Sequence, residues 1–428
     1  MKCMSLPAMS FDRQSIRSRA GSVLGAALLA ASFLLPGQAS AQQADVLHYW
    51  TSPSESKAMN ALASAFKAKG GTWIDSSAAN FDESTAALVS RITGGTQPSA
   101  VLTTPGKNLN ELVAAGYMRD FDAEATAGKW QEAVPPLVWD NMRIDGHVVA
   151  LPMGMHADNW VWYSKKIFDE LGLKEPKTWD EFFVAADAIK AKGYTALAVG
   201  GEPWQEVYVF IDAVLGLGGK DFYKRLLVDQ DPAAAQSPIV KDAFDLLRRL
   251  TAYIDPASPG RSWNDTTNMV ISDRAAMQLM GDWAKGEFSA AGKTAGRDYG
   301  CSLSPGSDGA YVIVLDTMAF PKVSKEEEIK GQELLAAQIM DPAVETAISA
   351  AKGSLPARLD VQQSDLDHCA AIGNELVKTS ENVLPSVYLS LSADRMGQMT
   401  DLVTQFWSDP SMTAEDAAKK FAEIFAAQ

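Results

Sequence analysis

The 428-residue sequence is poor in the residues on which metal binding and nucleophilic catalysis depend. Its four histidines show neither i,i+4 spacing nor grouping with cysteine, which argues against a zinc site. A G-x-S-x-G nucleophile elbow, a phosphate-binding loop and a dinucleotide fingerprint are all missing from the sequence. We therefore expect no metal, no cofactor and no catalytic residue, and hence a protein that is not an enzyme.

Basic residues are also scarce, because 38 Lys and Arg stand against 53 Asp and Glu and give a formal net charge of −15. A charge of this sign and size repels nucleic acid and anionic membrane surfaces at long range. We expect neither as a partner.

The one long apolar run that suggests a membrane-directed segment lies at residues 23–35. Two arginines precede it, and the small residues Ala-Ser-Ala follow at 39–41, as in a secretory signal peptide. The run is short for a membrane span, and no cysteine stands at the cleavage point to carry a lipid. We predict a signal peptide at residues 1–41, cleavage near Gln42 and a periplasmic protein without direct membrane insertion; a retained anchor helix is the alternative.

Cysteine is rare, with three residues in the whole chain. Cys3 lies in the predicted signal peptide, which leaves Cys301 and Cys369 in the mature protein. An oxidising compartment permits a disulfide between them, and two buried thiols are the alternative. Sequence alone does not give the separation of their Cα atoms, on which the choice depends.

Two strand-and-helix units can be read near the start of the mature chain. A strand at residues 44–50 is followed by a helix at residues 54–68 with apolar residues at helical spacing. The pattern repeats with a strand at residues 99–104 and a helix that stops at Gly116. These units predict an α/β fold with a mainly parallel sheet, and the chain length predicts two lobes.

Later helices are marked by their starts. Thr178 with Glu181, and Ser324 with Glu327, match the capping box, in which each side chain bonds the backbone of the other residue. Apolar spacing from Thr413 to the C-terminus predicts an amphipathic terminal helix. The α/β pattern is therefore expected to continue to the end of the chain.

Tryptophan is the residue type that stands out among those present. Six tryptophans lie beside Gly, Pro, Asn, Asp or the ends of expected strands, where a flat ring can face a sugar: Trp50, Trp160, Trp162, Trp204, Trp263 and Trp283. Sugars present an apolar C–H face and a set of hydroxyls, so their sites combine aromatic rings with polar side chains. Packing in the hydrophobic core is the alternative for any one of these rings.

Several motifs together resemble the bacterial glucose and mannose binding proteins, members of the maltose-binding-like group. The resemblance lies in V-L-H-Y-W-T-S at residues 46–52, G-D-W-A-K-G-E at residues 281–287 and K-G-S-L-P at residues 352–356. It implies a two-lobed periplasmic-binding-protein fold of type II with three hinge crossings. The crossings are expected near residues 151–154, 311–317 and 352–356.

The same resemblance implies that each lobe is discontinuous in sequence. The N-terminal lobe is expected to combine residues 42–152 with residues 312–352. The C-terminal lobe is expected to combine residues 153–311 with residues 353–428.

Four ligand-binding residues are implied on the N-terminal lobe. Tyr49 and Trp50 would form an aromatic wall, Glu55 would accept hydrogen bonds from hydroxyls, and Lys107 would donate them. For Glu55, a purely helix-capping charge is the alternative.

Five further binding residues are implied elsewhere. Trp283 would stack from the opposite lobe, while Asp316 and Lys352 on the crossings would hold hydroxyls. Trp204 and Trp263 could face the ligand or pack behind it, and Lys352 could instead be a charge at a helix C-terminus.

The expected function is that of a monomeric solute-binding component of an ABC sugar importer, which delivers a small sugar to the inner-membrane permease. Departures from the glucose-binding pattern at Val314 and Leu389 leave open a hexose, a small glycoside or a sugar derivative. The alternatives are a secreted glycoside hydrolase, for which Asp282 and Glu287 could be nominated, and a noncatalytic chemoreceptor or adhesin-type carbohydrate-binding protein.

Overall fold

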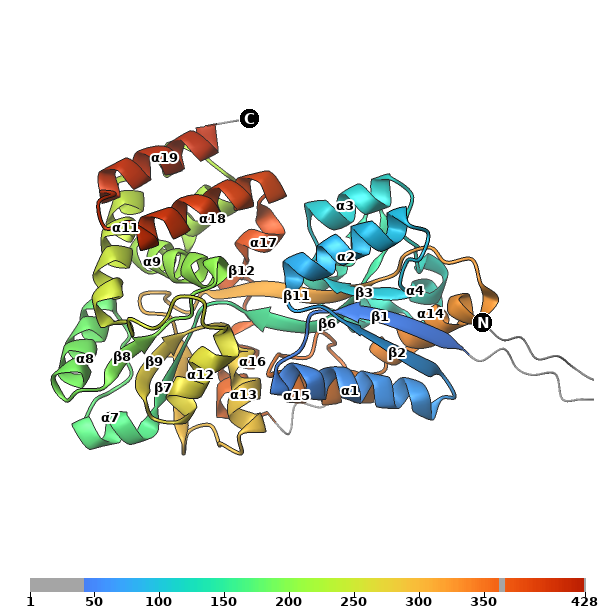
Figure 1. The fold of residues 1–428 in the computed structure, drawn as a ribbon, viewed down its shortest axis with the longest axis horizontal. Coiled ribbons are helices and arrows are strands. Elements are labelled where there is room, and N and C mark those ends of the chain that lie inside the picture. The colour runs from blue at the N-terminus through green and yellow to red at the C-terminus, as the bar shows by residue number, and fades with distance from the viewer. Residues whose placement is uncertain (1–41, 362–365, 427–428) are drawn as a thin grey trace, which may run out of the picture. The chain divides into compact units, whose positions relative to one another are not determined.

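The computed structural model describes residues 42–361 and 366–426. The predicted signal peptide lies outside these residues. Within them the protein is built from two sheets and many helices (Figure 1).

The first sheet has the strand order β12-β11-β3-β1-β2, with β6 paired to β11. Its strands are β1 (Gln43–His48), β2 (Thr72–Ser77), β3 (Ala100–Thr103), β6 (Ala150–Ala157), β11 (Tyr311–Ala319) and β12 (Val383–Pro385). β1 runs parallel to β2 and β3, as the strand-and-helix units predicted. The expectation of a mainly parallel sheet holds only in part, because β11 is parallel to β12 but antiparallel to both β3 and β6.

Helices pack around this sheet and connect its strands. They are α1 (Pro53–Ala68), α2 (Phe81–Thr93), α3 (Lys107–Ala114), α4 (Asp122–Ala127), α5 (Trp130–Ala133), α6 (Pro136–Asn141), α14 (Glu326–Ile339) and α15 (Pro342–Lys352). A short hairpin of β4 (Arg143–Ile144) and β5 (His147–Val148) precedes β6. α1 lies against α15, far from it in sequence (Figure 1).

The second sheet has the order β10-β7-β9-β8. Its strands are β7 (Trp160–Ser164), β8 (Thr195–Ala198), β9 (Ala275–Leu279) and β10 (Tyr299–Leu303). β8 is parallel to β9, while β7 is antiparallel to both β9 and β10. The strands β6 and β7 follow each other in the chain, as do β10 and β11, so these two connections join the sheets.

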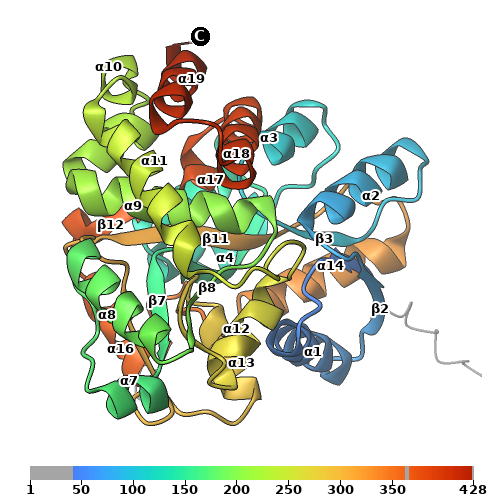
Figure 2. The ribbon, with the colours of Figure 1, turned by 60° about the vertical axis from the view of Figure 1, so that its left-hand side comes forward.

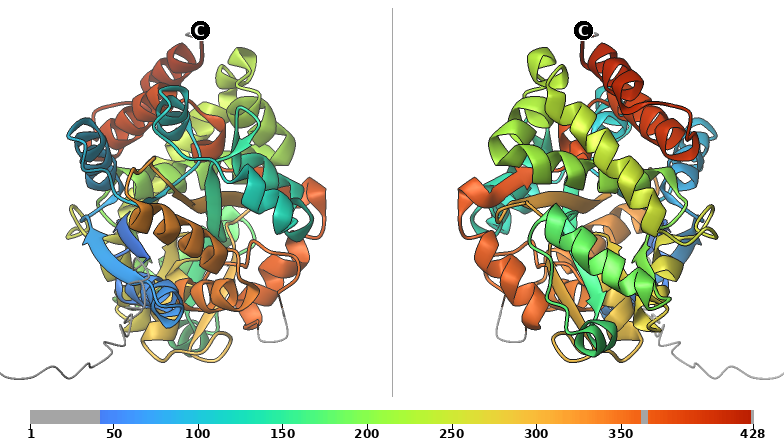
Figure 3. Two further views of the ribbon diagram at one scale, coloured as in Figure 1. Left: turned by 90° about the vertical axis from the view of Figure 1, so that its right-hand side faces the viewer. Right: turned by 90° about the vertical axis from the view of Figure 1, so that its left-hand side faces the viewer.

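The remaining helices surround the second sheet or extend beyond it. They are α7 (Lys165–Leu171), α8 (Trp179–Ala191), α9 (Pro203–Tyr223), α10 (Pro232–Ala235), α11 (Pro238–Leu250), α12 (Trp263–Ile271), α13 (Ala284–Ala290), α16 (His368–Leu376), α17 (Val387–Ser390), α18 (Ala393–Ser408) and α19 (Ala414–Ala426). The C-terminal helices α18 and α19 pack on α9 and α11 (Figure 3). The terminal amphipathic helix is therefore confirmed.

Two of the six candidate tryptophans belong to the core. Trp160 and Trp162 are 1% and 0% exposed and stack on each other with ring centroids 5.6 Å apart. Tyr311 packs edge-on against Trp160, and Phe288 packs against Trp162. Core packing, the alternative that the sequence left open for each ring, therefore accounts for these two tryptophans, whose neighbours are other buried rings.

The capping predictions had different outcomes. Thr178 accepts a hydrogen bond from the backbone of Glu181, whose carboxylate in turn accepts one from Lys177 N. Ser324 does not cap a helix, because α14 begins at Glu326 with Lys325 at the N-cap position and no side-chain cap bond. Three consecutive glutamates in the first turn of α14 interact favourably with the helix dipole instead.

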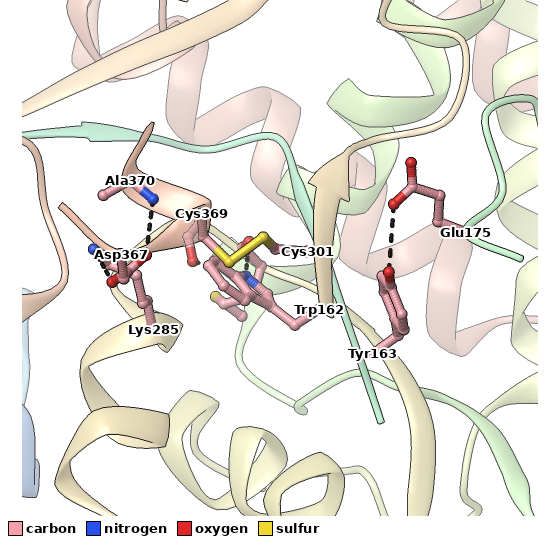
Figure 4. Close-up of a disulfide and its surroundings, with 10 residues drawn as sticks. Trp162, Tyr163, Glu175, Lys285, Cys301, Asp367, Cys369 and Ala370 are labelled. Carbon is pink, nitrogen blue, oxygen red and sulfur yellow. Dashed lines mark hydrogen bonds and ion pairs between the residues drawn. A yellow bond between two sulfur atoms is a disulfide. The ribbon is translucent and has the colours of Figure 1, made fainter. Parts of the chain in front are cut away.

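Cys301 on β10 and Cys369 on α16 form a disulfide, with their Cα atoms 6.0 Å apart (Figure 4). Trp162 lies beside the sulfur atoms. Close by, Lys285 on α13 pairs with Asp367 at 3.0 Å, at the N-cap of α16. Of the two possibilities that the sequence left open, the disulfide is confirmed.

Among the described helices, none is both long enough and apolar enough to cross a membrane. The residues that the structure describes contain no group of His, Cys, Asp and Glu side chains placed to hold a metal ion.

Candidate ligand-binding site

The segment between β1 and α1 brings Tyr49 and Trp50 beside residues from the far end of the chain. Trp50 is 1% exposed, and the hydroxyl of Tyr49 donates a hydrogen bond to Asp316 Oδ1 at 2.9 Å. Asp316 lies on β11, where its side chain remains partly accessible. Two of the predicted site residues are therefore in direct contact.

Glu55 in the first turn of α1 makes two kinds of contact. One carboxylate oxygen accepts hydrogen bonds from the backbone of Thr51 and Ser52, both at 3.1 Å, and completes a capping box with Ser52. The other oxygen accepts a bond from Lys352 Nζ at 3.0 Å. The helix cap and the contact with a second predicted site residue thus occur together.

Lys352 places its charge among three tryptophan rings. It is the last residue of α15, which Gly353 ends in the left-handed conformation, and its side chain is 4% exposed. Its Nζ atom lies 5.0 Å, 5.5 Å and 5.9 Å from the ring centroids of Trp50, Trp263 and Trp283. Cation–π attraction adds to the ion pair with Glu55 and fixes this long side chain.

Trp283 also belongs to a group of four aromatic residues. Its ring centroid lies 6.2 Å from that of Trp204 and 5.8 Å from that of Tyr208, both on α9. Tyr388 on α17 packs against Tyr208 at 5.8 Å. Tyr388 precedes Leu389, the position at which the glucose-binding pattern has a histidine, so an aromatic residue stands next to that position.

His156 on β6 joins the carboxylates of Asp282 and Asp316. Its Nδ1 lies 2.6 Å from Asp282 Oδ1, and its Nε2 lies 3.3 Å from Asp316 Oδ2. Burial alone would lower the pKa of His156, but the two carboxylates outweigh burial and raise that pKa to about 9. The imidazole is therefore a cation at neutral pH.

Burial likewise acts on Asp316, whose pKa it would raise. The imidazolium of His156, followed by the charge of Lys352, outweighs burial and holds the pKa of Asp316 below its usual value. Asp316 is therefore an anion that can accept hydrogen bonds from a hydroxyl.

Glu287 on α13 bonds the start of α1. One of its carboxylate oxygens accepts from Ser52 Oγ at 2.7 Å, Ser54 Oγ at 2.6 Å and Ser54 N at 3.1 Å. A Cβ atom on the neighbouring Gly286 would lie 2.5 Å from the carbonyl oxygen of Lys352. Glycine therefore lets α13 approach both α1, beside it in Figure 2, and the end of α15.

Comparison with known proteins gives the family. The family model of bacterial extracellular solute-binding proteins matches residues 50–339. The chain belongs to this family. A probable sugar-binding periplasmic protein of Rhizobium meliloti is 38% identical over 345 residues, which cover 80% of this chain and 83% of the relative. A second probable sugar-binding periplasmic protein, from Brucella suis, is 39% identical over 345 residues, which cover 80% of this chain and 81% of the relative.

Solved structures confirm the fold of the solute-binding protein. A chitin oligosaccharide binding protein aligns with a TM-score of 0.77 at 17% identity, covering 90% of this chain and 98% of that one. A solute-binding protein of Thermotoga lettingae bound with α-D-tagatose aligns with a TM-score of 0.71 at 18% identity, covering 90% and 100%. A maltose-maltodextrin binding protein of Alicyclobacillus acidocaldarius shares the fold with a TM-score of 0.68 at 17% identity, covering 90% of this chain and 100% of that one.

Eight of the nine predicted binding residues lie in one connected group in this solute-binding protein: Tyr49, Trp50, Glu55, Trp204, Trp263, Trp283, Asp316 and Lys352. Lys107 begins α3, and its side chain lies outside what the structure describes. Contact within one group is what a shared ligand requires, and the binding role of each residue stays a prediction.

Sequence reasoning missed four members of the group: His156, Tyr208, Asp282 and Tyr388. Asp282 adjoins Trp283 within a motif that was singled out, so its position was an available signal. Tyr388 likewise adjoins Leu389, whereas His156 and Tyr208 have no such signal, because their contacts depend on how distant elements pair and pack.

Proposed function

We propose that this solute-binding protein is the periplasmic receptor of an ABC sugar importer, and that it captures a monosaccharide, a small glycoside or a sugar derivative between two lobes. The observation that carries the proposal is the group of tryptophan rings around Lys352, with Glu55 and Asp316 beside them. Rings for an apolar sugar face and charged groups for its hydroxyls are the two components such a site needs.

In this proposal the lobes are residues 42–152 with 312–352 and residues 153–311 with 353–428. Each lobe then holds most of one of the two sheets, and the exceptions are the ends of the connecting strands β6 and β11 and the short strand β12, which pairs with β11. A sugar that touches both lobes favours the closed form in proportion to its greater affinity for that form. The closed receptor then docks as a monomer on the inner-membrane permease.

Binding roles follow from the chemistry of the side chains. Trp50, Trp263 and Trp283 stack on the sugar, Asp316 and Glu55 accept hydrogen bonds, and Lys352 donates them. Lys107 is proposed to donate from the N-terminal lobe. Specificity then depends on which hydroxyls find partners, because a buried polar group without a partner is costly.

A glycoside hydrolase is disfavoured by the contacts of the carboxylates that could be nominated for it. Asp282 is engaged by His156 and by Ala157 N, and Glu287 by Ser52 and Ser54. A general acid and its partner must exchange protons at the glycosidic bond, whereas these two carboxylates are held by groups of the protein itself. These contacts support a binding role without catalysis.

Thermal unfolding of the exported protein, purified from the periplasm, tests the proposal against a panel of sugars. The panel contains D-glucose, D-mannose, D-galactose, D-xylose, L-arabinose, D-tagatose, maltose, raffinose and chitobiose. We expect one class of sugar to raise the Tm by about 3 °C or more at saturating concentration, because the sugar binds the folded state alone.

Two results would contradict the proposal. A Tm that no member of the panel changes would argue against a sugar receptor. Release of nitrophenol from nitrophenyl glycosides would favour the hydrolase.

A further inference from the structure

His156 is enclosed, whereas the carboxylate beside it is accessible. The His156 side chain is 1% exposed and that of Asp316 is 14% exposed. The Asp316 side chain therefore keeps some contact with solvent, whereas the imidazole behind it has almost none. Any effect of His156 on binding must act through a neighbouring residue.

Asp282 fixes the orientation of the imidazole from the opposite side. Its Oδ1 is bonded to His156 Nδ1 at 2.6 Å, and its Oδ2 accepts from Ala157 N at 3.1 Å. The backbone N–H of Asp282 donates to the carbonyl of Ala157 at 2.9 Å. With Asp282 held at three points, the imidazole is left with Nε2 facing Asp316.

The backbone around Asp316 is arranged for the same contact. The pairing of β6 with β11 shifts register between Asp316 and Thr317, which is an irregularity that redirects a side chain. Opposite it, Gly154 has a φ of +154°, and a Cβ there would lie 2.7 Å from Ser354 Oγ and 3.6 Å from His156 Nε2. Glycine at this position avoids a clash with Ser354 and lets β6 pass close to it, with His156 Nε2 at contact distance.

We propose that His156 is a positioning residue of the ligand site, which holds the Asp316 carboxylate in the orientation in which it accepts hydrogen bonds from the bound sugar. The inference rests on the proposed function, in which Asp316 binds sugar hydroxyls. Tyr49 holds Asp316 Oδ1 at 2.9 Å, and His156 holds Oδ2. Without the imidazole, the Asp316 carboxylate would be held only at Oδ1, by Tyr49, and could rotate about that contact.

The pH dependence of the contact between His156 and Asp316 is determined by the charged groups that face His156. Asp282 and Asp316 flank the ring, and they raise the pKa of His156 to about 9 against the opposing effect of burial. Asp158, on the same segment, binds the hydroxyl of Ser386, and burial raises the pKa of Asp158 to about 8. Ionisation of Asp158 adds a negative charge near the ring and so favours the imidazolium.

Two further groups belong to this environment. Lys352 acts on Asp316 from the end of α15. Tyr311 on β11 approaches Asp282, and burial together with the charge of Asp282 raises the pKa of Tyr311 well above its usual value. Tyr311 therefore stays neutral over the range in which His156 loses its proton.

The first test compares His156→Gln with His147→Gln. His147 pairs with Asp122 at 2.7 Å in an exposed position, so it is a matched histidine–aspartate control. The probe is the panel sugar with the largest thermal shift, titrated by calorimetry at pH 7. We expect His156→Gln to raise the Kd about 30-fold, since a charge-assisted contact is lost, and His147→Gln to leave it within twofold.

A double-mutant cycle with Asp316→Asn separates positioning from general damage. If His156 acts through Asp316, adding His156→Gln to Asp316→Asn weakens binding no further. An unchanged Kd in His156→Gln, or effects of the two changes that multiply, would overturn the inference. A wild-type protein that binds no sugar of the panel would instead count against the proposed function.

The pH profile tests the inference without any variant. The wild-type Kd is expected to be constant from pH 6 to 8 and to rise above pH 9, as His156 loses its proton. Asp158→Asn should retain that rise, and His156→Gln, if it folds, should lose it. A wild-type Kd that stays flat to pH 10 would refute the role of His156.

Discussion

Trp283→Ala is expected to weaken sugar binding about 100-fold, because an aromatic residue at the centre of a binding site commonly contributes most of the affinity. Trp283 contacts Trp204, Tyr208 and the ammonium of Lys352, so its removal takes away the stacking face and loosens its neighbours. Calorimetry with the responsive sugar measures the change, and far-UV circular dichroism checks that the variant is folded.

Trp160→Phe is the matched control for this experiment. Trp160 is 1% exposed, stacks on Trp162 and is not one of the three rings around Lys352, so its replacement should lower the Tm and leave the Kd nearly unchanged. Trp283→Phe should show the opposite pattern, with a raised Kd and a smaller change in Tm. Equal affinity in Trp283→Ala and the parent protein would remove Trp283 from the site.

Loss of the disulfide should have the largest effect on stability. Cys301 and Cys369 are separated by 68 positions in sequence, and a closed loop of that size restricts the unfolded chain. The loop-closure relation predicts that Cys301→Ala with Cys369→Ala lowers the free energy of unfolding by about 4 kcal/mol. Urea unfolding of the exported variant and parent proteins measures the difference.

Reduction of the parent protein provides a second measurement of the same quantity. A thiol reductant should shift the urea midpoint of the parent to that of the double variant, and should leave the variant unchanged. Two reactive thiols in the denatured, unreduced parent would show that the bond does not form in the exported protein.

The general fold could be predicted from local patterns, whereas the pairing of distant strands could not. Strand-and-helix units near the N-terminus predicted β1, β3 and their helices correctly. The antiparallel pairing of β11 with β3 and β6 joins segments more than 150 residues apart, and it leaves no periodic signal in either segment. The parallel sheet was therefore predicted only in part.

The tryptophans show why the site was predictable as a group and uncertain residue by residue. Trp160 and Trp283 both lie next to polar residues or glycine, and both are more than 90% buried. They differ in their tertiary neighbours, since Trp160 meets other core rings and Trp283 meets Lys352. Only the packing of distant segments distinguishes the two environments.

His156 is the clearest case of a residue that sequence could not assign. In the sequence it is one of four histidines without metal-binding spacing, and no other pattern marks it. Its partners lie 126 and 160 positions away, on a loop and on β11. Interactions over such separations depend on strand register, and a single sequence does not define that register.

A sugar receptor has an overall affinity and an order of preference among sugars. The hydrogen bonds between Glu287 and the first turn of α1 concern the first of these properties and not the second. Glu287 bonds serines of the protein rather than any of the proposed sugar-binding side chains. In the proposed division α1 and α13 lie on different lobes, so this contact would favour closure by the same amount for every sugar, and substitutions there would shift all affinities together. The order of preference among sugars would remain with Asp316, Glu55 and Lys352. A population of bacteria could in this way adjust the nutrient concentration at which uptake begins without changing which nutrients it takes up.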